Sequence, residues 1–134
     1  MKKILIDMSA VIIHPGHIRL INKAKKYGNI YIALTTDREI KKKKKINPEL
    51  NFSQRKEVLM SLKNIKAVIP SPWIIDEKFL LKHKIDLLIH GEDNKNKVPK
   101  KKILIFPRTK GISTSIIRKK CFFNYKKKVK KKFF

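Results

Sequence analysis

The chain alternates between short runs of apolar residues and segments in which apolar residues recur at helical spacing. The apolar runs cover residues 3–9, 30–34, 66–70, 86–90 and 102–107. They are apolar at nearly every position, which is typical of strands that are covered on both faces of a sheet. We therefore predict an α/β fold, a Rossmann-like, doubly wound parallel sheet of five strands joined by right-handed crossovers.

Helices are expected between these strands. The spacing predicts helices over about 16–27, 53–63 and 73–83, and a last helix after residue 113. Ser53 and Ser113 are suitable N-caps, because a serine hydroxyl can accept a hydrogen bond from a free backbone amide of the first turn. Residues 38–51 are rich in lysine and contain Pro48, so we expect a loop or a frayed helix there.

The length of 134 residues is sufficient for one domain with a buried core. We expect this domain to cover residues 1–120 and to be followed by a loosely packed, basic and aromatic tail over 121–134. No apolar run approaches the ~20 residues of a membrane helix, and Asp7 interrupts the first run, so we expect neither membrane insertion nor a signal peptide. The single Cys121 is typical of a protein in the reducing cytoplasm.

The charge is strongly positive, with 35 lysines and arginines against 10 acidic residues and a net charge of +25. Such a charge favours a polyanionic partner, either a nucleic acid or the phosphates of a nucleotide. Lysine, isoleucine and asparagine are all plentiful, as in proteins encoded by AT-rich DNA, so we attribute most of the charge to composition and a solvated surface. The few arginines, Arg19, Arg38, Arg55, Arg108 and Arg118, are therefore more informative than the many lysines.

A ligand site is expected at one edge of the sheet. Ligands of open α/β sheets bind beyond the carboxyl ends of the strands. Polar residues follow four of the expected strands at that end, namely Ser9, Thr35 to Asp37, His90 to Asp93, and Arg108 with Thr109. His90, at the end of its strand, fits either a core position or a site.

The first candidate site residues are His14-Pro15-Gly16-His17, between the first strand and the first helix. Proline is tolerated in the first turn of a helix, and Gly16 lets a phosphate approach the backbone. The two histidines stand at i and i+3, so they share one face of the helix. Two histidines are too few for a zinc site, and we expect them to stabilise charge on phosphate oxygens.

A second candidate phosphate site is Arg108-Thr109-Lys110-Gly111-Ile112-Ser113-Thr114. This segment offers two cations, three hydroxyls and the free amides of a helix N-terminus.

These motifs together resemble the HxGH nucleotidyltransferases, and among them the small cytidylyltransferases that are similar to glycerol-3-phosphate cytidylyltransferase. Residues 14–17 match the HxGH motif, and residues 108–114 match the more specific R-T-x-G-I-S-T motif. Residues 51–56, 68–70 and 91–93 resemble the family's Y-x-x-R, V-I-P and G-D-D segments. The opening Met8-Ser9-Ala10 is similar to cytidylyltransferase domains associated with phosphoenolpyruvate mutase. The resemblance covers residues 1 to about 120.

The resemblance implies transfer of CMP from CTP, with Mg²⁺, to a small phosphate or phosphonate acceptor, and release of pyrophosphate. It implies catalytic roles for His14, His17, Arg108 and one lysine of the 41–45 run, for which we choose Lys44. It implies nucleotide or acceptor contacts for Ser9, Ala10, Gly16, Arg55, Gly91, Asp93, Thr109, Gly111, Ile112, Ser113 and Thr114, and no metal ligand from the protein. Homodimers are common in the family.

Two alternatives remain open at this point. An enzyme of the same superfamily can use ATP and act as an adenylyltransferase. A basic domain without activity can bind RNA or another polyanion, an interpretation favoured by the charge, by the aromatic residues of the tail, and by Val11, which stands where the family carries aspartate. We rank nucleic acid behind the nucleotide as a partner.

Overall fold

A computed structural model of the protein describes residues 1–133, with only the backbone described for the last two of them, and Phe134 of the expected tail lies outside the described residues. The sheet has five strands, β1 (Lys3–Met8), β2 (Asn29–Thr35), β3 (Ile65–Ser71), β4 (Leu87–His90) and β5 (Ile103–Ile105). Their order is β3-β2-β1-β4-β5, and every neighbouring pair is parallel. The predicted fold class is confirmed, and the strand order reverses at β1, where ligands bind in sheets of this kind.

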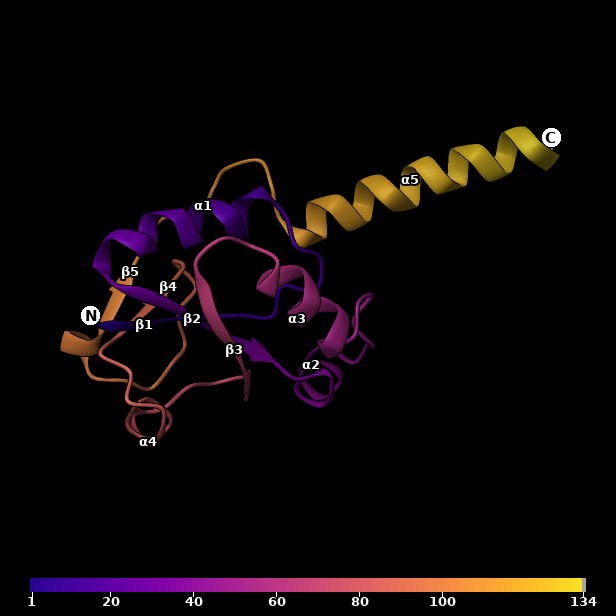
Figure 1. Ribbon diagram of the computed structural model, residues 1–134. Coiled ribbons are helices and arrows are strands. Elements are labelled where there is room, and N and C mark those ends of the chain that lie inside the picture. Colours follow the sequence, from indigo (N-terminus) through magenta and orange to yellow (C-terminus); the bar gives the residue numbers. More distant parts are fainter. Residues whose placement is uncertain (134) are drawn as a thin grey trace.

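Helices cover both faces of this sheet (Figure 1). They are α1 (Pro15–Ala24), α2 (Asp37–Lys44), α3 (Phe52–Met60), α4 (Glu77–Lys82) and α5 (Thr114–Phe133), with short 3₁₀ turns η1 (Lys25–Tyr27) and η2 (Lys100–Lys102). Ile4 and Ile6 of β1 pack in one cluster with residues of α1 and α3, whereas Leu5 packs in a second cluster with Leu80 of α4. Because successive strand residues point to opposite faces, two covered faces require the continuous apolar runs of the sequence.

The lysine-rich segment after β2 begins with an ordered helix, α2, where we expected a loop or a frayed helix, whereas residues 45–51 form the expected loop. The Thr36 hydroxyl accepts a hydrogen bond from the Glu39 amide at 3.4 Å. Acidic residues occupy the first turn and lysines the last turn, which is the favourable arrangement for the helix dipole.

The start of α3 also differs from the prediction. Asn51, and not Ser53, is the N-cap: its side chain accepts from the Gln54 amide at 2.9 Å, and the Gln54 side chain accepts from the Asn51 amide at 2.9 Å. This reciprocal capping box satisfies two free amides, whereas Ser53 as a cap would satisfy one. The next helix, α4, is shorter than expected and begins after Asp76 instead of at Trp73.

The last helix, α5, extends away from the body of the protein (Figure 1). Ser113 caps it as predicted, with its hydroxyl accepting from the Ile116 amide at 3.2 Å. The expected boundary at residue 120 falls inside this helix, and the segment that we expected to be a loosely packed tail continues it to Phe133. No glycine or proline interrupts residues 114–133, so nothing local ends the helix earlier.

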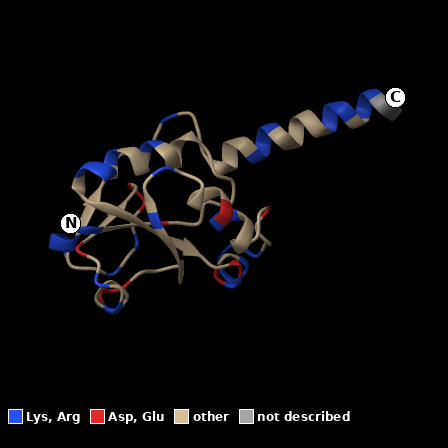
Figure 2. Ribbon diagram, in the orientation of Figure 1, with Lys and Arg blue, Asp and Glu red and all other residues tan. Residues whose placement is uncertain are grey.

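Lysines follow α5 along its length (Figure 2). Phe122, Phe123 and Tyr125 on this helix are each more than half exposed. Across residues 1–133, no helix is both long enough and apolar enough to span a bilayer.

Candidate active site

The two histidines of the first motif are held by the first turn of α1. The Nδ1 atom of His14 accepts a hydrogen bond from the Gly16 amide at 3.1 Å, and the Nδ1 atom of His17 accepts from the His14 amide at 3.2 Å. This is a capping box made by two imidazoles, whose ring centroids lie 3.9 Å apart. Because each Nδ1 is an acceptor, each neutral ring carries its proton on Nε2 and can donate from that atom to a ligand.

Both imidazoles are neutral at ordinary pH. Burial, and next the charge of His14, lower the pKa of His17 to about 4, and burial lowers the pKa of His14. Protonation of either Nδ1 would also remove an acceptor that the helix start uses. The pair therefore offers two neutral hydrogen-bond donors, which suits oxygen atoms on which negative charge increases during a reaction.

The position of the His14 ring requires glycine at residue 16. A Cβ atom at this position would stand 2.7 Å from Cε1 of His14, so any side chain would displace the imidazole. The same Cβ would stand 3.7 Å from the Ile112 side chain, which shows that the second motif lies against the first. The two candidate phosphate motifs, almost a hundred residues apart in sequence, therefore meet at the start of α1.

The second motif forms a turn between β5 and α5. Gly111 has a φ of 79°, in the left-handed region that favours glycine, within a turn at residues 110–111. Thr109, Ile112 and Thr114 are half-buried, and Ser113 caps α5. The turn thus presents hydroxyls next to a helix N-terminus, an arrangement that binds anions in other proteins.

Arg108 is held by the loop after β4. Its Nη2 atom lies 2.5 Å from Oδ2 of Asp93, and its backbone amide donates to Oε1 of Glu92 at 3.0 Å. The side chains of Arg108 and Asp93 are 62% and 59% exposed, so the pair lies open to a ligand. Gly91, at the start of the same loop, is half-buried.

A polar cluster beside this pair contains Asp7 and Asn96, which the sequence did not assign to the site, together with His90, which it left open between a core position and a site. Oδ1 of Asp7, in β1, lies 2.5 Å from Nδ1 of His90, in β4, and Nδ2 of Asn96 donates to Oδ2 of Asp7 at 2.8 Å. One sequence signal could have indicated this cluster: Asp7 is an acidic residue in an otherwise apolar strand. Ile6 pairs with Ile89 in the sheet, so the residues that follow them, Asp7 and His90, lie side by side.

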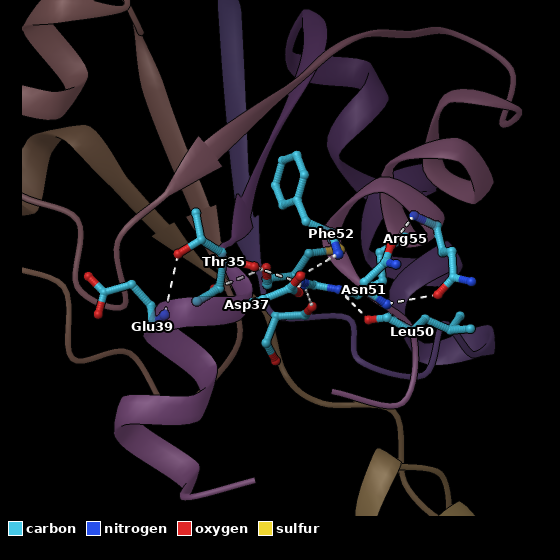
Figure 3. Close-up of polar contacts among 11 residues, drawn as sticks. Thr35, Asp37, Glu39, Leu50, Asn51, Phe52 and Arg55 are labelled. Atoms are coloured by element: carbon cyan, nitrogen blue, oxygen red, sulfur yellow. Dashed lines mark hydrogen bonds and ion pairs between the residues drawn. The ribbon is translucent and has the colours of Figure 1, made fainter. Parts of the chain in front are cut away.

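Arg55 has a role different from the one that the resemblance implies. The residue is completely buried, and its guanidinium donates to the carbonyl oxygens of Ser9, Thr35 and Leu50 at 2.6, 2.8 and 3.0 Å. It also donates to Oδ1 of Asp37 at 2.7 Å (Figure 3). A side chain bonded in this way braces the ends of β1 and β2 from inside and offers no exposed surface to a phosphate or acceptor.

The remaining candidates lie at the same edge of the sheet. Ser9 and Ala10 follow β1, and Ala10 is buried with a φ of 44°. Val11 is also buried, so the position at which the resembling family carries aspartate provides no carboxylate. The Nζ atom of Lys44 lies 5.4 Å from the ring centroid of Trp73, so this lysine contacts an aromatic face at the end of α2.

No cluster of three or more histidine, cysteine, aspartate or glutamate side chains suitable for a metal occurs in the described part of the chain. A magnesium ion at this site would therefore have to take most of its ligands from substrate phosphates and water, as Mg²⁺ commonly does.

Comparison with known proteins identifies the family. The family model described as cytidylyltransferase-like matches residues 12–120. The chain is 31% identical over 124 residues to a glycerol-3-phosphate cytidylyltransferase of Bacillus subtilis, an alignment that covers 88% of this chain and 95% of the relative. It is 40% identical over 80 residues to choline-phosphate cytidylyltransferase 2 of Arabidopsis thaliana, which covers 58% of this chain and 26% of the relative.

A solved structure supports the fold. The crystal structure of the lipopolysaccharide core biosynthesis protein from Thermoplasma volcanium superposes with a TM-score of 0.67 at 19% identity, and covers 81% of this chain and 98% of that one. By its sequence, its parallel sheet and its family match, this chain belongs to the cytidylyltransferase-like family of nucleotidyltransferase enzymes.

Proposed function

We propose that this protein transfers CMP from the magnesium complex of CTP to a small acceptor that carries a phosphate or phosphonate, and releases pyrophosphate. The acceptor oxygen forms a bond to the α-phosphorus, and the bond from that phosphorus to the bridging oxygen of the β-phosphate breaks. The electron pair of the broken bond leaves with pyrophosphate. The observation that carries this proposal is the meeting of the two imidazole donors with the turn after β5.

The role that we propose for each residue follows from its chemistry. Nε2 of His14 and of His17 donates to oxygens of the reacting phosphates, where charge increases in the transition state. Arg108, Thr109 and the first amides of α5 bind the triphosphate. When bound with CTP, Mg²⁺ would supply neutralisation of the phosphate charge, and no nucleophile from the protein is needed.

Two features bear on the class of acceptor. Relatives aligned over nearly their whole length are named glycerol-3-phosphate cytidylyltransferases, which favours a polyol phosphate. The opening Met8-Ser9-Ala10 resembles a branch that favours a phosphonate instead. Lys44, beside Trp73 at the end of α2, is the cation that we assign to the acceptor anion.

The test is release of pyrophosphate from CTP and Mg²⁺ in the presence of glycerol 3-phosphate, choline phosphate and 2-aminoethylphosphonate, each offered separately. We expect turnover with at least one of them, and a loss of about 10²–10³-fold in kcat for His14→Ala or His17→Ala, the usual effect of removing one transition-state donor. His83→Ala is the matched control, because this histidine lies near the end of α4. Turnover with ATP but not CTP would favour the adenylyltransferase alternative, and no turnover with any acceptor would contradict the proposal.

A further inference from the structure

The cluster beside Arg108 forms an unbroken series of alternating charges from the centre of the sheet to the surface. Asp7 contacts His90 through Oδ1, the Nε2 atom of His90 lies 3.5 Å from Oδ1 of Asp93, and Oδ2 of Asp93 lies 2.5 Å from Nη2 of Arg108. Asp7 and His90 are 10% and 19% exposed, whereas Asp93 and Arg108 are more than half exposed. The inner half of the series is therefore fixed and the outer half is accessible to a ligand.

We infer that His90 is a positioning residue that sets the availability of Arg108: by neutralising Asp93, protonated His90 lets Arg108 leave that carboxylate for the triphosphate of the bound nucleotide. This inference rests on the proposed function, because it takes Arg108 as a ligand of the triphosphate. It adds a residue, and a dependence on proton concentration, to the site.

The imidazole ring of His90 is flanked by a carboxylate at each of its two nitrogens. Ionised carboxylates only accept hydrogen bonds, and His90 lies between two of them, one at each ring nitrogen. A proton on Nδ1 satisfies the contact with Asp7, and a second proton on Nε2 gives the ring a positive charge 3.5 Å from Oδ1 of Asp93. The second carboxylate oxygen of Asp7 is occupied by Asn96, and Asn96 is in turn held by the Ile75 amide at 2.7 Å, so Asp7 cannot turn away from the ring.

The electrostatics of the cluster agree with this geometry. Burial acts against the charged form of His90, but the hydrogen bond and charge of Asp7, together with the charge of Asp93, outweigh burial and the opposing charge of Arg108 and raise the pKa of His90. These are the charged groups that face the ring from β1, from the loop after β4 and from the segment after β5.

The consequence for the nucleotide follows from charge balance. A triphosphate can draw Arg108 away only if Asp93 keeps a cationic partner, since an unpaired carboxylate beside a polyphosphate repels it. Protonated His90 is that partner. Above the pKa of His90, Asp93 depends on Arg108 alone and competes with the nucleotide for it.

The test is the affinity for the magnesium complex of CTP between pH 6 and pH 9, measured by calorimetry on the full chain. We expect the Kd of the wild type to rise about three- to tenfold more over this range than that of His90→Gln, a size appropriate to one partly exposed charge. CTP itself titrates in this range, but equally for every variant, so the ratio between variants isolates the protein. Asp93→Asn should behave as His90→Gln does, and His83→Gln should behave as the wild type does.

A second measurement does not depend on turnover. The imidazole signal of His90 in NMR, identified by its absence from His90→Gln, should titrate above 6.5 in the wild type and at lower pH in Asp7→Asn. Saturating CTP should raise the pKa of His90, because coupling between two binding events is reciprocal. A larger rise of the His90 pKa in the wild type than in Asp93→Asn would show that CTP acts on His90 through Asp93. An equal rise in both would show that the phosphates act directly on His90.

The outcomes separate the two proposals. If CTP binds but the wild type and His90→Gln show the same dependence on pH, or if His90 titrates at or below 6.5, the role of His90 is wrong and the proposed function stands. If neither the wild type nor any variant binds CTP at any pH, the proposed function is overturned and the inference fails with it.

Discussion

Two pairs of arginine and aspartate lie at the carboxyl edge of this sheet, and they differ in nearly every physical respect. Arg55 is completely buried, bonded to three carbonyl oxygens besides Asp37. The side chain of Arg108 is 62% exposed and, among the residues that the structure describes, it is bonded only to Asp93. Both arginines match motifs of the family in sequence, so the sequence alone assigns both to ligand contacts.

The difference shows that an arginine–aspartate pair can either stabilise the fold or remain available to bind a ligand. Removing a buried charge from four partners is costly, so Arg55 stays in place whatever binds. An exposed pair contributes little to stability, so Arg108 can leave Asp93 for a phosphate without destabilising the fold. The contrast predicts that substitutions of one arginine act on stability and substitutions of the other act on turnover.

The largest effect is expected for Arg55→Ala. It removes the guanidinium donor from the carbonyl oxygens of Ser9 and Thr35 and from Oδ1 of Asp37, and should lower the free energy of unfolding by about 3–5 kcal/mol. Urea denaturation followed by circular dichroism measures this. Arg55→Lys keeps the charge but loses the forked donor geometry, so it should lie between wild type and alanine; a stable Arg55→Ala variant that has lost only CTP affinity would restore the ligand role.

The complementary effect is expected for Arg108→Ala. Its kcat/KM for CTP should fall by about 10²–10³-fold, as when one preorganised donor is removed from a transition state. Its free energy of unfolding should stay within about 0.5 kcal/mol of wild type, as for an exposed ion pair. Steady-state kinetics measures the loss of kcat/KM, and urea denaturation of the same preparation measures the stability. A destabilised Arg108→Ala variant would contradict the contrast with Arg55.

His17 and His90 should change the stability of the protein with pH in opposite directions. The pKa of His17 is about 4 in the folded protein and 6.5 when unfolded, so its contribution to stability is fully present above pH 6.5 and is lost as the pH falls towards 4. Relative to His17→Gln, in which glutamine can keep the cap acceptor, wild type should lose about 2–3 kcal/mol over that range.

His90 should show the reverse dependence. Its pKa is raised on folding, so its contribution is present below pH 6.5 and is lost as the pH rises through the folded value. Denaturation of wild type and His90→Gln at several pH values measures the difference. Curves with the same slope for both histidines would contradict the assignment of a neutral His17 and a protonated His90.

The smallest effect is expected for a third pair, between Arg118 of α5 and Glu49. Both guanidinium contacts measure 2.5 Å, but the side chains are 34% and 44% exposed. Glu49→Gln should lower the free energy of unfolding by less than about 1 kcal/mol. A larger loss by urea denaturation would show that α5 contributes to the folded core through this contact.

The sheet and the first candidate motif can be predicted from local patterns in the sequence. Continuous apolar runs such as Ile4 to Ile6 required a sheet covered on both faces, and the motif at His14 to His17 placed the histidines on one turn of a helix. These are local patterns, and local sterics and burial suffice to interpret them.

The roles of residues that are distant in sequence follow from the folded arrangement and not from local patterns. Whether an arginine lies inside or outside depends on which carbonyl oxygens the fold brings to it, as at Arg55, and no local pattern records that. The pairing of Asp7 with His90 arises from strand register across a crossover, although the two residues are 83 positions apart. The proton positions on His14 and His17, by contrast, are set locally by amides two and three residues away. The placement of charge around His90 and Arg108 is therefore a property of the assembled sheet edge, because their partners Asp7 and Asp93 come from other segments of the chain.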